Sequence, residues 1–223
     1  MDGLLINTED IYTIVTNEVL AEYGKGTLTW DLKIQLQGLP GAQAARKVLD
    51  YFQLPLTMEE FESKVIELQY KKWPTCTFLP GALELIQYLH TKKIPIALCT
   101  SSAKHKFQGK TDHLRHGFDL FDVIITGDDP RIPQGRGKPF PDIWQLGLKE
   151  LNAKLEASIH PTECIIFEDG LPGVTSAKAA GAYVIWIPHP EALEFLGNTD
   201  AVLDGKGELL GSLTHFDKEK FGI

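Results

Sequence analysis

Apolar residues recur at helical spacing through the first third of the chain. Those between Ile11 and Leu20 fall on one face of a helix, for which Asn7 or Thr8 offers a capping side-chain oxygen and Gly24 a stop. Acidic residues in the first turn of this helix favour its dipole. The chain is therefore predicted to begin with a short non-helical segment and then a helix.

Two more helical faces follow, at residues 48–52 and 61–68. Thr57 precedes the second of them with Glu60 three residues on, which is the spacing of a capping box. No convincing strand pattern interrupts these faces. Residues 8–77 are therefore predicted to form a small helical bundle.

Beyond residue 80 the pattern changes to short apolar runs that alternate with helical stretches. Strands are predicted at residues 95–99, 123–125, 164–167, 183–186 and 201–203. Helices are predicted at residues 82–90, 107–115, 143–151 and 173–180. Continuous apolar strands separated by helices are typical of a parallel sheet covered on both faces. The fold class predicted from this pattern is α/β.

The composition is that of an ordinary globular chain with an acidic balance. Its 223 residues are 43% hydrophobic and 23% charged, and the formal net charge is -8. This balance argues against broad nucleic-acid binding, which needs a basic surface. No apolar run is long enough for a bilayer, and no secretory signal is recognisable. Cys76, Cys99 and Cys164 suit a reducing compartment, so a cytoplasmic location is expected. We also expect a monomer without membrane or nucleic-acid partners.

Polar residues gather where the predicted strands end. Thr100 and Ser101 follow one strand, Glu168 and Asp169 follow another, and Lys138 lies in a loop rich in glycine and proline. Parallel sheets of this kind bind ligands beyond the carboxyl ends of their strands. Hydroxyls, a lysine and paired carboxylates are therefore expected to meet at one edge of the sheet.

These residue types suit phosphoryl transfer, which needs positioning and charge neutralisation. Glu168 and Asp169 can bind Mg²⁺, Lys138 can neutralise a phosphate, and the Thr100 hydroxyl can donate to it. Asp2 can act as a general acid and then as a general base. Each also has a plainer role: helix-starting acids, a solvated lysine, a capping threonine, a disordered terminal aspartate. Their order at successive strand ends favours the joint interpretation.

Four segments carry these residues, namely 1–9 (MDGLLINTE), 98–102 (LCTSS), 137–142 (GKPFPD) and 167–170 (FEDG). They resemble the four motifs of the haloacid dehalogenase-like hydrolase superfamily. The resemblance implies a Rossmann-like parallel sheet core at residues 1–7 and 78–223, with a helical cap inserted at residues 8–77. Within the superfamily the chain looks most similar to pseudouridine-5'-phosphatase-like enzymes.

The resemblance also implies a role for each residue in a Mg²⁺-dependent phosphomonoesterase. Asp2 would protonate the leaving oxygen and later activate water. Thr100 and the Ser101 N–H would bind the phosphoryl group, and Lys138 would neutralise it. The implied metal ligands are Asp2 (through its carbonyl), Glu168 and Asp169.

In the same resemblance the cap selects the substrate. The cap loop expected to face the site contains Gln37 and Gly38. Similar enzymes act on sugar phosphates, polyol phosphates and nucleotides. The expected partner is therefore a small phosphorylated metabolite, with pseudouridine 5'-phosphate as one candidate.

The first motif of the superfamily is Asp-x-Asp-Gly, and here only its second aspartate, Asp2, is present. The nucleophile would lie just upstream of Met1, on an apolar strand between the strands that end at Thr100 and Glu168. Without the nucleophile, the chain as given is expected to be inactive. Without the strand, ladder groups stay unpaired, so it is also expected to be poorly stable. A start assigned at an internal Met, a truncated chain and a naturally shortened protein are the three explanations.

Two alternatives to a phosphatase use the same residues. A phosphosugar mutase of the same fold would retain and return the phosphoryl group. A shortened, non-catalytic protein would bind phosphometabolites without turnover. An in-frame apolar run ending in aspartate ahead of Met1 would favour an enzyme, whereas a stop codon directly before Met1 would favour the non-catalytic protein.

Overall fold

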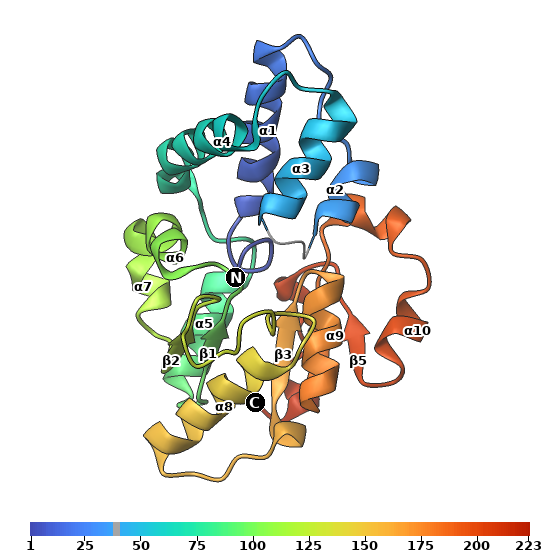
Figure 1. Ribbon diagram of the computed structural model, residues 1–223. Helices are drawn as coiled ribbons and strands as arrows, with labels where there is room; N and C mark the ends of the chain where they lie inside the picture. The colour runs from blue at the N-terminus through green and yellow to red at the C-terminus, as the bar shows by residue number, and fades with distance from the viewer. Residues whose placement is uncertain (38–40) are drawn as a thin grey trace.

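A computed structural model describes residues 1–37 and 41–223 of the chain. Gly38, one of the two residues expected to select the substrate, lies outside the described residues. The helices of the first third of the chain form one layer, and the strands with the other helices form a second (Figure 1). The N-terminus lies where the two layers meet, so the first predicted motif is at this junction.

The first layer, here called the helical insert, contains α1 (Thr8–Glu22), α2 (Trp30–Leu36), α3 (Gly41–Phe52) and α4 (Met58–Lys72). Its apolar faces form a core of their own, which includes Val19, Val48 and Phe61. The predicted capping box is confirmed: the Thr57 hydroxyl accepts from the Glu60 N–H at 3.2 Å, and the Glu60 carboxylate accepts from the Thr57 N–H at 2.8 Å. No strand occurs in the described part of the insert, as the helical pattern predicted.

Of the two residues predicted to cap α1 with a side chain, Asn7 and Thr8, Asn7 occupies the N-cap position but does not form the cap. The Asn7 side-chain oxygen accepts from the Thr77 N–H at 2.8 Å and makes no capping bond to α1. The Asn7 N–H donates to the Thr77 carbonyl at 3.2 Å, so the two ends of the insert lie side by side. An asparagine ahead of a helix can bond to any nearby backbone group, and here the returning chain occupies it.

The second layer contains strands and the helices that alternate with them. The strands are β1 (Ala97–Cys99), β2 (Val123–Ile125), β3 (Ile165–Glu168), β4 (Tyr183–Trp186) and β5 (Gly207–Leu209). The helices are α5 (Ala82–Thr91), α6 (Lys104–Thr111), α7 (Arg115–Phe118), α8 (Asp142–Leu155), α9 (Leu171–Ala180) and α10 (Thr199–Leu203). The predicted alternation is confirmed through β4, although a 3₁₀ turn splits the helix predicted at 107–115 into α6 and α7. None of the helices among the described residues is both long and apolar enough to cross a membrane.

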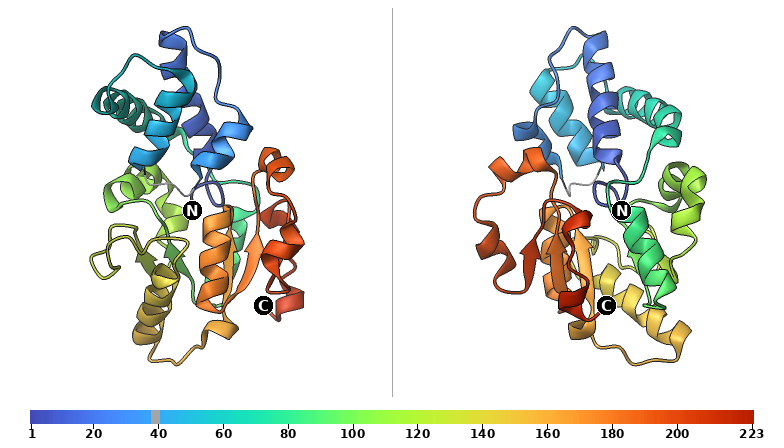
Figure 2. Two further views of the ribbon diagram at one scale, coloured as in Figure 1. Left: turned by 45° about the vertical axis from the view of Figure 1, so that its right-hand side comes forward. Right: turned by 180° about the vertical axis from the view of Figure 1, so that it is seen from behind.

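The strands form two parallel sheets in place of the single sheet predicted. β1 pairs with β2, with Leu98 beside Ile124, while the other sheet has the order β3, β4, β5. α5 packs on one face of the strands, and α8 with α9 cover the other (Figures 1 and 2). Alternate residues of the strands point to opposite faces. Ile166 and Val184 lie in the core with α9, whereas Ile185 lies in the core with α5.

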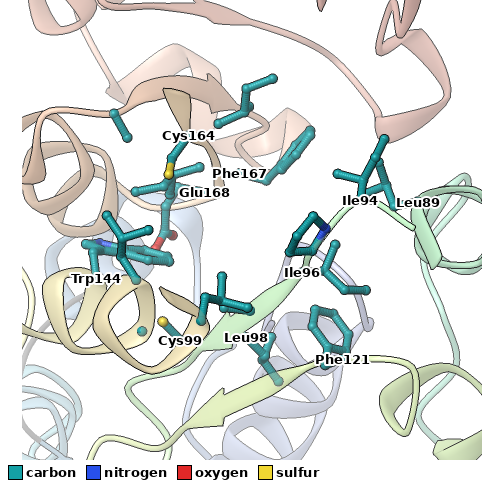
Figure 3. Close-up of a pocket in the computed structure, with 18 of the residues that line it drawn as sticks. Leu89, Ile94, Ile96, Leu98, Cys99, Phe121, Trp144, Cys164, Phe167 and Glu168 are labelled. Atoms are coloured by element: carbon teal, nitrogen blue, oxygen red, sulfur yellow. The ribbon is translucent and has the colours of Figure 1, made fainter. Parts of the chain in front are cut away.

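An apolar cavity of about 370 Å³ lies between β1 and β3. Side chains of both strands line it, among them Leu98 and Phe167, and Met1 lines it as well (Figure 3). Within residues 1–37 and 41–223, no strand pairs with the edges of β1 and β3 that face each other. The cavity therefore lies between the facing edges of the two sheets.

The strand predicted at residues 201–203 is wrong, because these residues belong to α10. The Asn198 side-chain oxygen caps this helix by accepting from the Ala201 N–H at 3.0 Å, and Asp204 ends it with a φ of 51°. Three apolar residues carry too little pattern to separate a helical turn from a strand. The last strand, β5, begins at Gly207, where a Cβ would lie only 2.3 Å from a backbone oxygen of β4.

Candidate active site

Lys138 joins the carboxyl ends of β1 and β3. Its ammonium donates to a Glu168 carboxylate oxygen at 2.5 Å and to the Cys99 carbonyl at 3.0 Å. The Lys138 side chain is 12% exposed and that of Glu168 8%, so the plainer interpretation of a solvated lysine does not hold. The Glu168 carboxylate points towards Trp144 inside the cavity (Figure 3). Two predicted site residues thus meet across the gap between the sheets.

Thr100 and Ser101 lie at the end of β1 but not at a helix N-terminus. The hydroxyl of the buried Thr100 accepts from the Ser102 N–H at 3.1 Å, and α6 begins only at Lys104. The condition for a helix-terminus phosphate site, a helix that starts at Ser101, is therefore not met. Gly127 packs so closely on this turn that a Cβ there would lie 2.2 Å from the Ser101 carbonyl. The Thr100 hydroxyl and the exposed backbone of this turn are therefore the groups here that could bind a phosphate.

Asp2 is held by two hydrogen-bond donors. The Lys110 ammonium donates to one carboxylate oxygen at 2.6 Å, and the Ser102 hydroxyl donates to the other at 3.0 Å. Burial, the largest single influence, would raise the pKa of the Asp2 carboxyl, but the charges of Lys110 and the Met1 amine and the hydrogen bond from Lys110 together outweigh it and lower the pKa to about 2. Asp2 is therefore an ordered, ionised carboxylate and not a disordered terminal residue.

Asp169 follows β3 and lies among other carboxylates. Burial raises its pKa to about 8, with further contributions from the negative charges of Glu168 and Glu9. Glu9 comes from the first turn of α1, and Gly3 fits between the two acids. A Cβ on Gly3 would lie 2.6 Å from an Asp169 oxygen and 2.9 Å from Cγ of Glu9. This concentration of negative charge favours the binding of a cation.

The acids at this edge fit a Mg²⁺ ion that keeps several water ligands. The hydrogen bonds of Asp169 within the described residues involve its backbone alone, so its carboxylate oxygens are available to a metal. Among those residues, no group of three or more acidic, His or Cys side chains is arranged to hold a metal ion. Mg²⁺ does not require such a cage, because it commonly binds one or two carboxylates together with waters and substrate oxygens. Asp169, Glu168 and the Asp2 carbonyl are the groups that would hold it.

Gln37 of the helical insert approaches the same edge. It follows α2, and its side-chain oxygen would lie 3.9 Å from a Cβ placed on Gly170. Arg136, in the loop between β2 and α8, donates to the Asp142 carboxylate at 2.7 and 2.8 Å and so does not extend towards this edge. The structure thus brings Gln37 to the predicted site and ties Arg136 to its own loop.

A family model described as haloacid dehalogenase-like hydrolase matches residues 1–187. The chain belongs to this family. The hydrolase is 66% identical over 223 residues to the probable pseudouridine-5'-phosphatase of Saccharomyces cerevisiae, across all of this chain and 94% of that protein. It is 34% identical over 225 residues to the mitochondrial (DL)-glycerol-3-phosphatase 1 of Arabidopsis thaliana, across all of this chain and 72% of that protein. The resemblance stated from the four motifs is confirmed.

Solved structures show the same fold for the hydrolase. The crystal structure of the HAD hydrolase, family IA, variant 3, from Entamoeba histolytica superposes with a TM-score of 0.72. The superposition covers 99% of this chain and 94% of that chain at 23% sequence identity. The chain therefore has a fold already observed by crystallography.

Two residues that were not predicted for the site of the hydrolase contribute to it: Glu9 ends the first motif segment, whereas Lys110 lies in no motif. Lys110 pairs with Asp2, and Glu9 adds negative charge beside Asp169. A signal for the lysine does exist in the sequence. Lys110 falls three residues after Phe107 and four before Leu114, on an apolar helical face where a solvated lysine is out of place.

Replacing Gly173 by alanine is expected to separate Glu168 from Lys138. A Cβ at this position of α9 would lie 2.2–2.4 Å from the Glu168 carboxyl group, which cannot move away without leaving the lysine. Overpacking of this kind costs about 1–3 kcal/mol of unfolding free energy, measurable by urea denaturation. Gly26→Ala is the control, since no atom lies within 4 Å of its added Cβ. Equal stability of the two variants would contradict the close packing.

Stability without metal is expected to fall as pH rises from about 4 to about 8, because of Asp169. The folded-state pKa of about 8 lies above the ordinary 3.8, so in this window the folded hydrolase holds a proton that the unfolded chain has lost. Asp169→Asn should remove this slope and raise the melting temperature at pH 8. Because Mg²⁺ competes with the same proton, its affinity should be higher at pH 8 than at pH 6. Identical pH profiles for wild type and variant would contradict the assignment.

Proposed function

We propose that this hydrolase is a Mg²⁺-dependent phosphomonoesterase that acts on a small phosphorylated metabolite. The observation that carries the proposal is the meeting of Lys138, Glu168 and Asp169 at the carboxyl ends of β1 and β3, with Asp2 beside them. Phosphoryl transfer needs this combination of a fixed positive charge and oxygen ligands for a metal. The name of the 66% identical yeast relative makes pseudouridine 5'-phosphate the first substrate to test.

In this proposal each residue has one task. Thr100 and the Ser101 backbone hold the phosphoryl oxygens, and Lys138 neutralises their charge. Asp2 gives a proton to the leaving oxygen and later takes one from water. The anionic substrate opposes the charge of Lys110, and this raises the low pKa of Asp2 towards the range of a general acid. A bound Mg²⁺ supplies additional charge neutralisation at the phosphoryl group.

The proposed nucleophile is an aspartate at the end of an apolar strand that fills the cavity between β1 and β3. Met1 lines this cavity, and its amine is buried near the charges of Glu168 and Lys138, at the carboxyl ends of both strands. A strand parallel to its neighbours would end there and lead directly into Met1. The residue before Met1 would then lie beside Lys138, where an attacking carboxylate is needed.

The helical insert acts as the cap in this proposal, with residues 8–77 as the cap and residues 1–7 and 78–223 as the core. Gln37 is the residue of the insert that we propose to contact the substrate, because its side chain approaches Gly170. The monomeric state and the cytoplasmic location stay predictions of the sequence.

The test is a phosphate-release assay with the chain extended by the residues encoded in frame ahead of Met1. The panel contains pseudouridine 5'-phosphate, glycerol 3-phosphate and a hexose phosphate, each with and without Mg²⁺. We expect Mg²⁺-dependent release of free phosphate, fastest from pseudouridine 5'-phosphate. An isomerised sugar phosphate without release would instead support a mutase, and binding without turnover would support a non-catalytic protein.

A further inference from the structure

Lys110 is fully buried, with 0% of its side chain exposed. It donates to an Asp2 carboxylate oxygen at 2.6 Å and to the Ser102 hydroxyl oxygen at 2.8 Å. The Ser102 hydroxyl in turn donates to the other Asp2 oxygen at 3.0 Å. Both oxygens of the carboxylate are therefore fixed by one linked network, which sets the orientation of the carboxylate plane as well as its position.

Aromatic residues at both ends of the helical insert hold Lys110 in place. Its ammonium lies 5.2 Å from the centre of the Tyr12 ring in α1 and 5.5 Å from that of Trp73, directly after α4. The neighbouring Gly109 lets α6 approach closely, since a Cβ there would lie 2.8 Å from the Trp73 ring. The Lys110 ammonium thus lies between Asp2 and the aromatic side chains at the two ends of the insert.

We propose that Lys110 is a positioning residue that fixes the Asp2 carboxylate for proton transfer; this rests on the proposed role of Asp2 as acid and base. A buried lysine that only balanced charge would need one contact to the carboxylate. Here the lysine also orients Ser102, so that the two donors reach different oxygens. A displacement of about 1 Å in a reacting group can cost about 100-fold in rate.

The test compares Lys110→Met, Asp2→Asn and the double variant in the enzyme used for phosphate release. Lys110→Met is expected to lower kcat by about 100-fold with little change in KM, because the substrate itself does not touch the lysine. In the Asp2→Asn background, the same substitution should have little further effect, since Lys110 acts through Asp2. Ser102→Ala, which leaves the ion pair in place, should lower kcat by about tenfold.

Thermal denaturation of each variant separates loss of fold from loss of positioning. A folded Lys110→Met variant with the kcat of the wild type would overturn the proposal. So would an equal loss of kcat in the Asp2→Asn background. If Lys110→Met does not fold, a wild-type kcat in Ser102→Ala overturns the proposal instead. Absence of phosphate release by the wild type, by contrast, would count against the proposed function itself.

Discussion

An apolar strand added ahead of Met1 is expected to raise the free energy of unfolding by several kcal/mol. It would pair with β1, which has three residues, and with β3, which has four. Each aliphatic side chain buried in the cavity contributes about 1.5–3 kcal/mol, and each ladder hydrogen bond about 1 kcal/mol. Ordering the backbone costs about 1–2 kcal/mol per residue, so stabilisation is the net result.

The matched control is an extension of the same length made of serine and asparagine, which cannot fill an apolar cavity. Urea denaturation should show a higher midpoint for the apolar extension, together with a steeper transition, because more surface becomes exposed on unfolding. If both extensions left the unfolding free energy unchanged, the cavity between β1 and β3 would not be a site for a strand.

Replacing Lys138 by methionine is expected to cost about 3–5 kcal/mol of stability, the usual result of removing one partner of a buried ion pair. The buried carboxylate of Glu168 would lose the ammonium that lies 2.5 Å from it. The double variant Lys138→Met with Glu168→Gln should recover part of this loss, because no uncompensated charge is then left at this position.

The exposed pair of Lys71 and Glu67 provides the control for this prediction. Its ammonium and carboxylate lie 2.6 Å apart, but the two side chains are 65% and 68% exposed. Lys71→Met should therefore cost at most about 0.5 kcal/mol. A comparable loss for Lys71→Met and Lys138→Met in denaturant unfolding would show that burial does not strengthen the Lys138 pair.

Much of the fold was open to prediction because its elements carry long patterns. The apolar face of α1 and the capping box of α4 specify helices locally, and the continuous apolar runs of β1 to β4 indicate a buried parallel sheet. The segment at residues 201–203 lacks such length, and its helix depends on a cap at Asn198. The cap predicted at Asn7 failed for a related reason, because the competing Thr77 lies far away in the sequence.

The residues of the candidate site were likewise predictable only where a local pattern or the strand topology specifies them. Strand-end residues such as Thr100 and Glu168 were predictable, since topology alone brings the ends of parallel strands together. The ion pair of Lys110 with Asp2 depends on how α6 packs below the helical insert, and residue spacing carries no information about that packing. The helix predicted from residue 107 begins at Lys104, and a turn that packs against Gly127 separates it from Thr100.

Phosphate release from pseudouridine 5'-phosphate, with and without Mg²⁺, is the decisive test for the chain extended by the residues encoded in frame ahead of Met1. We expect release that requires Mg²⁺ and that Asp169→Asn abolishes in a folded protein. Release that persists without Mg²⁺ or in Asp169→Asn would contradict the metal site. A folded, Mg²⁺-bound chain that releases no phosphate from this or any other phosphomonoester would contradict the proposed function.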